Sequence, residues 1–216
     1  MTFIQAKHGY FDGSNKPRWI VVHDMEYPKR VGSARWCANF FATTSPSSAH
    51  YCVDPAEVIQ SVREEDGAWH THGYAGGVEI NRASIGIEHA GYYTQTREQW
   101  LDELGNAELD LSAKLSAEIA ERWDIPIRRL SVEEIRAGLP GFAGHHDFVL
   151  ATRTGSHVDP GVGFPWDVYL SRVQRYSGGE VIGPLLVAAS LTFILYVAHR
   201  NGLIRLPRPI GHLLPI

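Results

Sequence analysis

The chain contains very little cysteine. Only Cys37 and Cys52 occur among its 216 residues, which is too few for the disulfide framework of a small secreted domain. We expect two buried free thiols, with a disulfide between a helix and a strand as the alternative. A chain of this length can bury a full hydrophobic core without disulfides, so we expect one domain of ordinary size with a modest extension.

The chain also lacks a cluster of lysine and arginine. Its formal net charge is −4, and because residues 177–216 carry a balance of +2, residues 1–176 carry −6. An acidic domain without a basic cluster gives no electrostatic reason to bind nucleic acid. The hydrophobic content of 44% and the charged content of 20% are typical of a folded globular chain.

The N-terminus shows no basic, then apolar, then small-residue progression, so we expect no cleavable signal peptide. Near the other end, residues 181–198 (VIGPLLVAASLTFILYVA) contain no charged residue. A helix over this run would measure ~27 Å, slightly short of the ~30 Å hydrocarbon core of a bilayer. We predict a C-terminal hydrophobic helix that forms a membrane segment, with a buried helix as the alternative.

Glycines in residues 177–180 predict a linker, which divides the chain into a domain of residues 1–176 and a tail of residues 181–216. Three arginines beyond the hydrophobic run weakly favour a cytoplasmic C-terminus. The absent signal peptide argues the other way, so the orientation of the tail stays open.

Hydrophobic periodicity predicts strands that alternate with helices. Apolar runs predict strands at residues 19–23, 49–53, 57–62 and 84–89, the middle two forming a hairpin. Helical spacing predicts helices at residues 34–42, 97–123 and 165–176, and a short helix that follows the capping box at 131–134. Ser33 is the expected cap of the first helix. If the second helix is interrupted, we expect the interruption at Gly105-Asn106. The face of the first helix that should lie on the sheet contains Trp36, Cys37, Phe40 and Phe41. The expected fold class is α/β, with a single mixed central β-sheet flanked by helices.

Residues 144–160 (GHHDFVLATRTGSHVDP) gather potential metal ligands in what we expect to be a loop-rich stretch. In an extended segment His145 and His146 point to opposite sides, whereas His157 and Asp159 share one face. We take His145 and Asp159 as a ligand pair, with His157 beside them. A catalytic zinc site typically takes three protein ligands, and the best third candidate is His23, which ends a buried apolar run.

Five motifs carry a resemblance to a known family. VVHDM at 21–25, SAHYCVD at 48–54, AWHTHG at 68–73, SIGIEHAG at 84–91, and GHHD with HVDPGVGFPW at 144–166 occur in this order. They resemble the motifs of the zinc N-acetylmuramoyl-L-alanine amidases, a superfamily that includes peptidoglycan recognition proteins and many phage endolysins. The resemblance covers about residues 18–170.

The resemblance implies that His23, His145 and Asp159 bind Zn²⁺ and that Glu88 is the general base. Many relatives have a lysine where this chain has His157, and we expect His157 to donate a hydrogen bond to the developing oxyanion. Some relatives also have a tyrosine where Ala49 stands, which leaves Glu88 as the only evident base.

The implied substrate is peptidoglycan, cleaved at the amide between N-acetylmuramic acid and L-alanine, and the implied location is the cell envelope. Aromatic and histidine side chains pack well on sugars and peptides, so Trp69, His70, His72 and Trp166 are candidates to line the substrate groove. The alternative for these four residues is packing in the core or at the rim. The resemblance favours an endolysin. The alternatives are a peptidoglycan-binding module without catalysis and a membrane-active lysis protein with the tail as effector.

Overall fold

The computed structural model describes residues 1–178. The predicted C-terminal helix and membrane segment at residues 181–198 therefore lie outside the described residues. Within residues 1–178, no helix has both the length and the apolar character needed to cross a membrane.

A six-stranded mixed sheet forms the centre of the fold. Its strands lie in the order β1 (Thr2–Phe3), β4 (Val58–Gln60), β3 (Tyr51–Val53), β7 (Ser84–His89), β2 (Trp19–Asp24) and β8 (Gly141–Gly144). The expected hairpin is confirmed, because β3 and β4 pair antiparallel. The strands β3, β7, β2 and β8 run parallel to their neighbours. A separate hairpin joins β5 (Tyr74–Ala75) to β6 (Val78–Glu79), and a 3-10 turn η1 (Ile80–Arg82) leads into β7.

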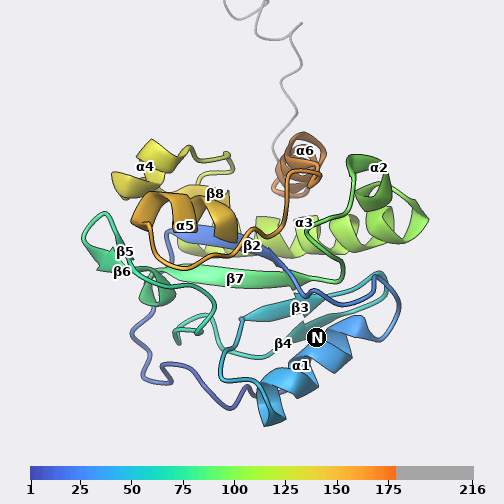
Figure 1. Cartoon of the computed structure of the whole chain (residues 1–216), viewed down its shortest axis with the longest axis horizontal. Helices are drawn as coiled ribbons and strands as arrows, with labels where there is room; N and C mark the ends of the chain where they lie inside the picture. The colour runs from blue at the N-terminus through green and yellow to red at the C-terminus, as the bar shows by residue number, and fades with distance from the viewer. Residues whose placement is uncertain (179–216) are drawn as a thin grey trace, which may run out of the picture. The chain divides into compact units, whose positions relative to one another are not determined.

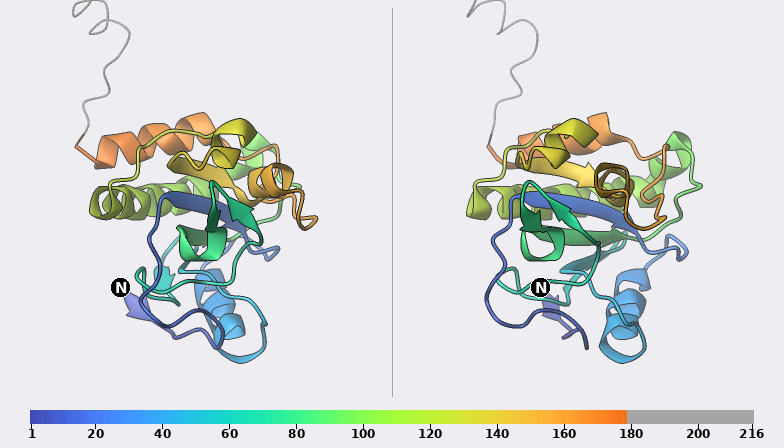
Figure 2. Two further views of the ribbon diagram at one scale, coloured as in Figure 1. Left: turned by 90° about the vertical axis from the view of Figure 1, so that its left-hand side faces the viewer. Right: turned by 60° about the vertical axis from the view of Figure 1, so that its left-hand side comes forward.

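Helices cover both faces of this sheet. One face packs on α3 (Glu103–Trp123) and α6 (Trp166–Tyr176), and α2 (Arg97–Trp100) precedes α3. On the other face, α1 (Ser33–Thr43) contacts β3 and β4, while α5 (His145–Thr152) contacts β8 and β2 beside α4 (Val132–Arg136) (Figure 1 and Figure 2). The ends of β7 and β2 therefore lie between α1 and α5.

Strand alternation places the functional side chains on the α1 and α5 face. In β2, Ile20 and Val22 join the core under α3 and α6, whereas Trp19 and Val21 pack on the opposite face with Phe148 of α5. Because side chains alternate along a strand, His23 belongs to the face of Trp19 and Val21. Parallel strands covered on both faces read as continuous apolar runs, and every residue of β2 is buried.

The first helix differs from the expectation in its cap and in its buried face. Gly32, not Ser33, is the N-cap residue, and Asp54 of the hairpin accepts hydrogen bonds from the backbone N–H groups of Gly32 and Ala34 at 2.8 and 3.0 Å. The side chains that face the sheet are Ala34, Cys37, Ala38 and Phe41. Trp36 and Phe40 are 40% and 39% exposed, so their expected contact with the sheet was wrong.

Two further boundaries differ from the expectation. The helical region at residues 97–123 breaks at Leu101 and Asp102 rather than at Gly105, because the Asp102 side chain caps α3 by accepting the N–H of Gly105 at 2.8 Å. The stretch after Gly144 is not wholly loop, because α5 occupies its first half. Asp147 stabilises the start of α5 by accepting the N–H of Gly144 at 2.7 Å.

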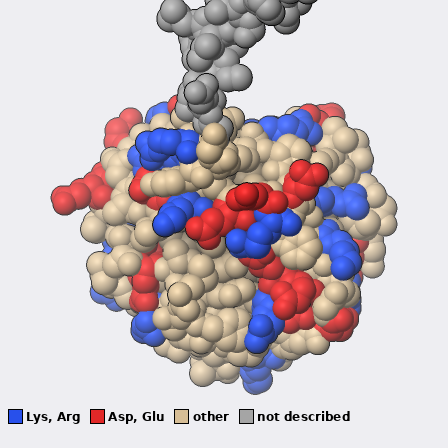
Figure 3. Space-filling view, turned by 180° about the vertical axis from the view of Figure 1, so that it is seen from behind, with Lys and Arg blue, Asp and Glu red and all other residues tan. Residues whose placement is uncertain are grey.

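Both cysteines are free and buried, which confirms the expectation of two free thiols. The surface charge also follows the composition. On the face opposite to that of Figure 1, lysine and arginine side chains alternate with aspartate and glutamate rather than gathering in one basic patch (Figure 3).

Candidate metal centre and substrate cleft

Three side chains that are distant in the sequence meet at one point. His23 of β2, His145 at the start of α5 and Asp159 of the following loop are buried, and each offers a ligand atom within 4.8 Å of the other two. The Nδ1 atom of His23 lies 2.9 Å from Oδ2 of Asp159, and the Nδ1 atom of His145 lies 3.3 Å from Oδ1. Two imidazoles with one carboxylate form a donor set typical of catalytic zinc, which leaves a fourth position for water or substrate. The residues therefore fit Zn²⁺.

The sheet register brings His145 beside His23. Val22 pairs with Gly144, so the next residue of each segment emerges at the same edge. A Cβ atom on Gly144 would lie 2.6 Å from Cδ of Pro160, so only glycine allows the loop that carries Asp159 to approach. The N–H of His146 donates to the Asp159 carbonyl at 3.0 Å and holds that loop in place.

Only one of the neighbouring histidines faces the centre, but the reason is helical rather than extended geometry. His145 is buried in the cluster, whereas the Nδ1 atom of His146 lies 2.8 Å from the carbonyl oxygen of His157. Asp147 also turns away, since its Oδ2 atom accepts a hydrogen bond from Arg129 at 2.5 Å. His146 and Asp147 thus support the loop and the helix.

A chain of hydrogen bonds lies behind His23. The Nε2 atom of His23 is 2.9 Å from Nδ1 of His70, and Nε2 of His70 is 3.0 Å from Oγ of Ser84. Because the Ser84 hydroxyl donates to the Ile80 carbonyl at 2.6 Å, it accepts from His70, which in turn accepts from His23. This direction leaves Nδ1 of His23 as a free lone pair toward Asp159 and the metal position.

His70 lines the cavity over the cluster, in agreement with the expectation of a groove residue, but it also contacts His23. It is only 7% exposed, and burial lowers its pKa well below the usual value, so it stays neutral and its Nδ1 atom can accept a hydrogen bond from His23. A Cβ atom on Gly86 would lie 2.7 Å from Cγ of His70, so glycine at this point of β7 makes room for the ring. His70 is therefore placed to orient His23, a candidate metal ligand.

Replacing His70 by alanine should weaken Zn²⁺ binding by about 10–100-fold, because the tautomer and the orientation of His23 would no longer be held. Competition with a chromophoric chelator measures this affinity. His72→Ala is the matched control, because His72 is exposed and outside the hydrogen-bond chain, and its affinity should equal that of the wild type. Equal affinities in both variants would contradict the positioning role.

Glu88 lies next to His23 on the neighbouring strand. His23 and Cys52 are its register partners on β2 and β3, so the three side chains form a row on one face of the sheet. Burial raises the pKa of Glu88 well above its usual value, and the nearby Asp159 carboxylate raises it further. A carboxyl group with a raised pKa beside a metal position is suited to proton transfer near neutral pH.

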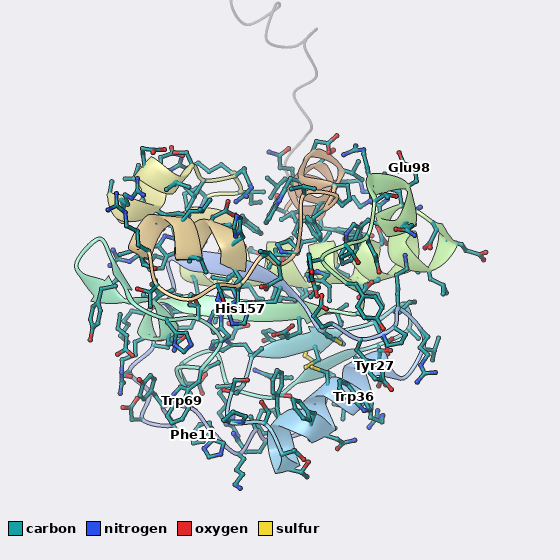
Figure 4. The ribbon with its side chains drawn as sticks, viewed as in Figure 1. Phe11, Tyr27, Trp36, Trp69, Glu98 and His157 are labelled. Atoms are coloured by element: carbon teal, nitrogen blue, oxygen red, sulfur yellow. The ribbon has the colours of Figure 1, made fainter. Side chains whose placement is uncertain are left out.

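His157 covers the outer side of the cluster. Its ring stacks on that of His145, with centroids 4.1 Å apart, and its Nδ1 atom lies 3.5 Å from Oδ1 of Asp159. The side chain is 55% exposed, and the hydrogen bond to Asp159 raises its pKa. Figure 4 shows His157 in front of the central strands, between the α1 and α5 sides. It therefore borders the position where a metal could bind.

The histidines and Asp159 depend on each other electrostatically. Burial lowers the pKa of His145 to about 4, so this ligand is neutral. Although burial alone would raise the pKa of Asp159, its contacts with the imidazoles of His145, His157 and His23 hold it well below the usual value. Neutral imidazoles with an ionised carboxylate are the protonation states that metal binding requires.

A cavity of about 820 Å³ opens over the cluster. His23, Glu88, His145 and Asp159 line it, as do Trp69, which is 37% exposed, and His72. Trp166 does not line this cavity, so of its two expected roles the structure shows packing. Its ring packs 4.9 Å from that of Phe164 and lies under the Arg129 guanidinium at 3.9 Å.

Several cleft residues were not anticipated. Trp36 and Phe40 of α1 form part of one wall, and Tyr10 and Tyr93 line other parts of the cavity (Figure 4 labels Trp36 and Trp69). The helical spacing of Trp36 and Phe40 was evident in the sequence, but it was assigned to the buried face. No sequence motif distinguished Tyr10 or Tyr93.

Comparisons with known proteins agree with this geometry. A family model described as N-acetylmuramoyl-L-alanine amidase matches residues 13–162. Because this match covers more than half of the chain, the protein belongs to the N-acetylmuramoyl-L-alanine amidase family. A search of curated proteins found no match.

Solved structures share the fold at low sequence identity. The hydrolase AmiA of Staphylococcus aureus, in complex with its ligand, has a TM-score of 0.58 and 14% identity over 83% of this chain and 84% of its own. An AmpD derivative has a TM-score of 0.54 and 22% identity over 80% and 93%. A mutant endolysin from Bacillus subtilis has a TM-score of 0.53 and 18% identity over 80% and 97%.

Proposed function

We propose that this protein is a zinc-dependent hydrolase that cleaves the amide bond between N-acetylmuramic acid and L-alanine in peptidoglycan. The observation that carries the proposal is the convergence of His23, His145 and Asp159 beside Glu88 at the base of the cleft. Membership of the amidase family supports this substrate and this bond.

The reaction needs an activated water, a stabilised oxyanion and a proton for the departing nitrogen. When bound by His23, His145 and Asp159, zinc supplies the Lewis acid that polarises the carbonyl and activates water. Glu88 takes the proton of the attacking water as the new carbon–oxygen bond forms. It returns that proton to the amine of L-alanine as the carbon–nitrogen bond breaks.

Digestion of purified peptidoglycan, followed by mass analysis of the soluble products, tests the proposed bond. We expect stem peptides with a free L-alanine N-terminus and glycan strands that keep intact lactyl carboxylates. Release of sugars with new reducing ends would indicate a glycosidase, and cleavage inside the stem would indicate a peptidase. Either product pattern alone would contradict the proposal.

In this proposal His157 stabilises the oxyanion. Its exposed ring beside Asp159 can donate to an oxygen that develops negative charge at the metal position. The His157→Ala variant should lose about 10²-fold in kcat with a smaller change in KM, and His157→Lys should recover part of the loss, since lysine also supplies a charged donor. Steady-state kinetics on a soluble muramoyl peptide measure both constants. Unchanged kcat in His157→Ala would remove this role.

We also propose an endolysin-like lytic role at the cell envelope, with residues 181–198 as a membrane segment. The uncharged run in the sequence supports the membrane part of this proposal. A chain that ends at Ser177 should still digest isolated peptidoglycan but should no longer sediment with lipid vesicles. Lysis that disappears together with the tail, while wall digestion persists, would assign the lytic effect to the tail.

A further inference from the structure

One part of the cleft is built around the ring of Trp69, next to His70 in the chain. Trp69 lines the cavity, and its side chain remains 37% exposed. Ser48 holds its backbone, since the Trp69 N–H donates to the Ser48 hydroxyl at 2.9 Å and the Trp69 carbonyl accepts the Ser48 N–H at 3.0 Å. His8 stacks on the indole and Tyr10 meets it edge-on, both with ring centroids 5.6 Å away. The ring is therefore held in place and open to the cleft.

Asn81 supplies a free hydrogen-bond donor in the same part of the cleft. It belongs to the turn η1, lines the cavity and is only 7% exposed. Its Oδ1 atom accepts the backbone N–H groups of His70 and Thr71 at 3.2 and 2.9 Å, which fixes the amide because only its oxygen can accept. Within residues 1–178, its Nδ2 atom donates to no protein atom and is not closed off from solvent.

The surroundings of Asn81 favour a neutral acceptor. An amide donor in a largely buried position is costly to leave unpaired, so a ligand that brings an oxygen to it is favoured. Glu79 lines the same cavity, and its carboxylate already accepts the Tyr10 hydroxyl at 2.7 Å and pairs with Arg82 at 3.4 Å. Its charge disfavours a second carboxylate nearby. Within residues 1–178, no lysine or arginine lines the cavity to offset that repulsion. A carbonyl oxygen therefore fits better than an acid.

Asn81 lies close in the hydrogen-bond network to the metal cluster. It holds the backbone of His70, and the Nδ1 atom of His70 lies 2.9 Å from Nε2 of His23. In N-acetylmuramic acid, the acetamido group and the lactyl group occupy neighbouring carbons of the sugar ring. A substrate whose lactyl carbonyl lies at the metal position therefore carries an acetamido oxygen only a few bonds away. Figure 4 shows Trp69 apart from Trp36, with His157 between them in this view, so the sugar and the stem can occupy different parts of the cleft.

We propose that Asn81 and Trp69 form the subsite for the sugar of the muramoyl peptide. The Nδ2 atom of Asn81 donates to the carbonyl oxygen of the acetamido group, and the sugar ring packs on the indole of Trp69. The inference rests on the proposed function, because it concerns the sugar next to the same scissile amide. An aromatic face beside a fixed polar donor is suited to a ligand with an apolar C–H face and one carbonyl. The enzyme should therefore distinguish sugars by their acyl oxygen.

Two synthetic muramoyl peptides test this recognition. They are identical except that the sugar carries an acetyl group in one and a thioacetyl group in the other, which is neutral and similar in shape but has sulfur, a weak acceptor. Wild-type enzyme should show a KM about fivefold lower for the acetyl peptide, with similar kcat, because one neutral hydrogen bond is lost. Equal KM values would overturn the subsite while leaving the amidase activity intact.

The Asn81→Asp variant removes the donor but keeps an oxygen for the N–H groups of His70 and Thr71. It should lose the preference for the acetyl peptide, while its zinc affinity stays that of the wild type because His70 remains held. Asn39→Asp is the matched control, since Asn39 is exposed on α1 and does not line the cavity. It should keep the full preference. If Asn81→Asp kept the preference, or raised KM equally for both peptides, Asn81 would not read the acyl oxygen.

A binding measurement separates this inference from the proposed function. Calorimetry on the full-length, zinc-loaded Glu88→Gln variant compares the Kd values of the two peptides without turnover. A Kd about fivefold lower for the acetyl peptide supports the subsite even if wild-type enzyme cleaves neither peptide, a result that would count only against the amidase reaction. Equal Kd values would overturn the subsite.

Adding Trp69→Ala to the Glu88→Gln variant tests the aromatic ring. The Kd of the acetyl peptide should rise about fivefold, because the sugar loses the indole on which it packs. The Kd of a lactoyl peptide, which has the same stem without the sugar, should stay unchanged. An equal rise for both ligands would place Trp69 against the stem and overturn the assignment of the sugar.

Discussion

Replacing Glu88 by glutamine should lower kcat for muramoyl-peptide hydrolysis by about 10³-fold, with zinc affinity unchanged. Glutamine keeps the size of the side chain but cannot accept and return a proton. Glu88 is the cavity-lining acid in register with His23, and burial raises the pKa of its carboxyl group. Proton transfer to the leaving amine is therefore the step that should fail.

Glu79→Gln is the matched control for this prediction. Glu79 lines the same cavity, but its carboxylate is occupied by Arg82 and Tyr10, so its loss should change kcat by less than about threefold. Single-turnover kinetics and zinc titration of both variants measure the two effects separately. If Glu88→Gln kept kcat within tenfold of wild type, the base would have to be another group.

Removing the metal should abolish hydrolysis, and so should the loss of its only carboxylate ligand. Chelator-treated wild-type protein should lose about 10³-fold or more in activity and recover when Zn²⁺ is restored, because Lewis-acid activation contributes several kcal/mol. Asp159→Ala should not recover. This variant leaves His23 and His145 without the carboxylate that both now contact.

Asp147→Asn is the control for the ligand substitution. Asp147 belongs to the same segment, but it binds Arg129 and the Gly144 N–H and turns away from the cluster. Its zinc content, measured by atomic emission, and its activity should match those of the wild type. Full activity in chelator-treated protein would refute zinc dependence, and full activity in Asp159→Ala would remove Asp159 from the ligand set.

The strands near the site could be predicted because local pattern and tertiary role coincide there. The apolar runs that became β2 and β7 are buried on both faces, and a parallel sheet covered on both faces requires such runs. The capping box at Ser131 could also be predicted from the sequence, since its hydrogen bonds join residues only three apart. Local signals of this kind do not depend on the rest of the chain.

At the first helix, the errors occurred because a distant group decides the local structure. Asp54, which comes from the hairpin, caps α1, so Ser33 was a reasonable but wrong cap. The side chains of α1 that face the sheet depend on how the helix lies across β3 and β4, which periodicity alone does not specify. Trp36 and Phe40 therefore line the cleft instead of packing in the core as expected.

The sequence by itself determined the amidase family, the mixed sheet and the four polar groups proposed for the chemistry, because these depend on residue types at set positions in ordered motifs. Tertiary structure alone decided that His70 contacts His23 and that Trp166 lies away from the cleft. The physical reason is that hydrogen-bond partners and burial arise from segments that meet only after the chain has folded.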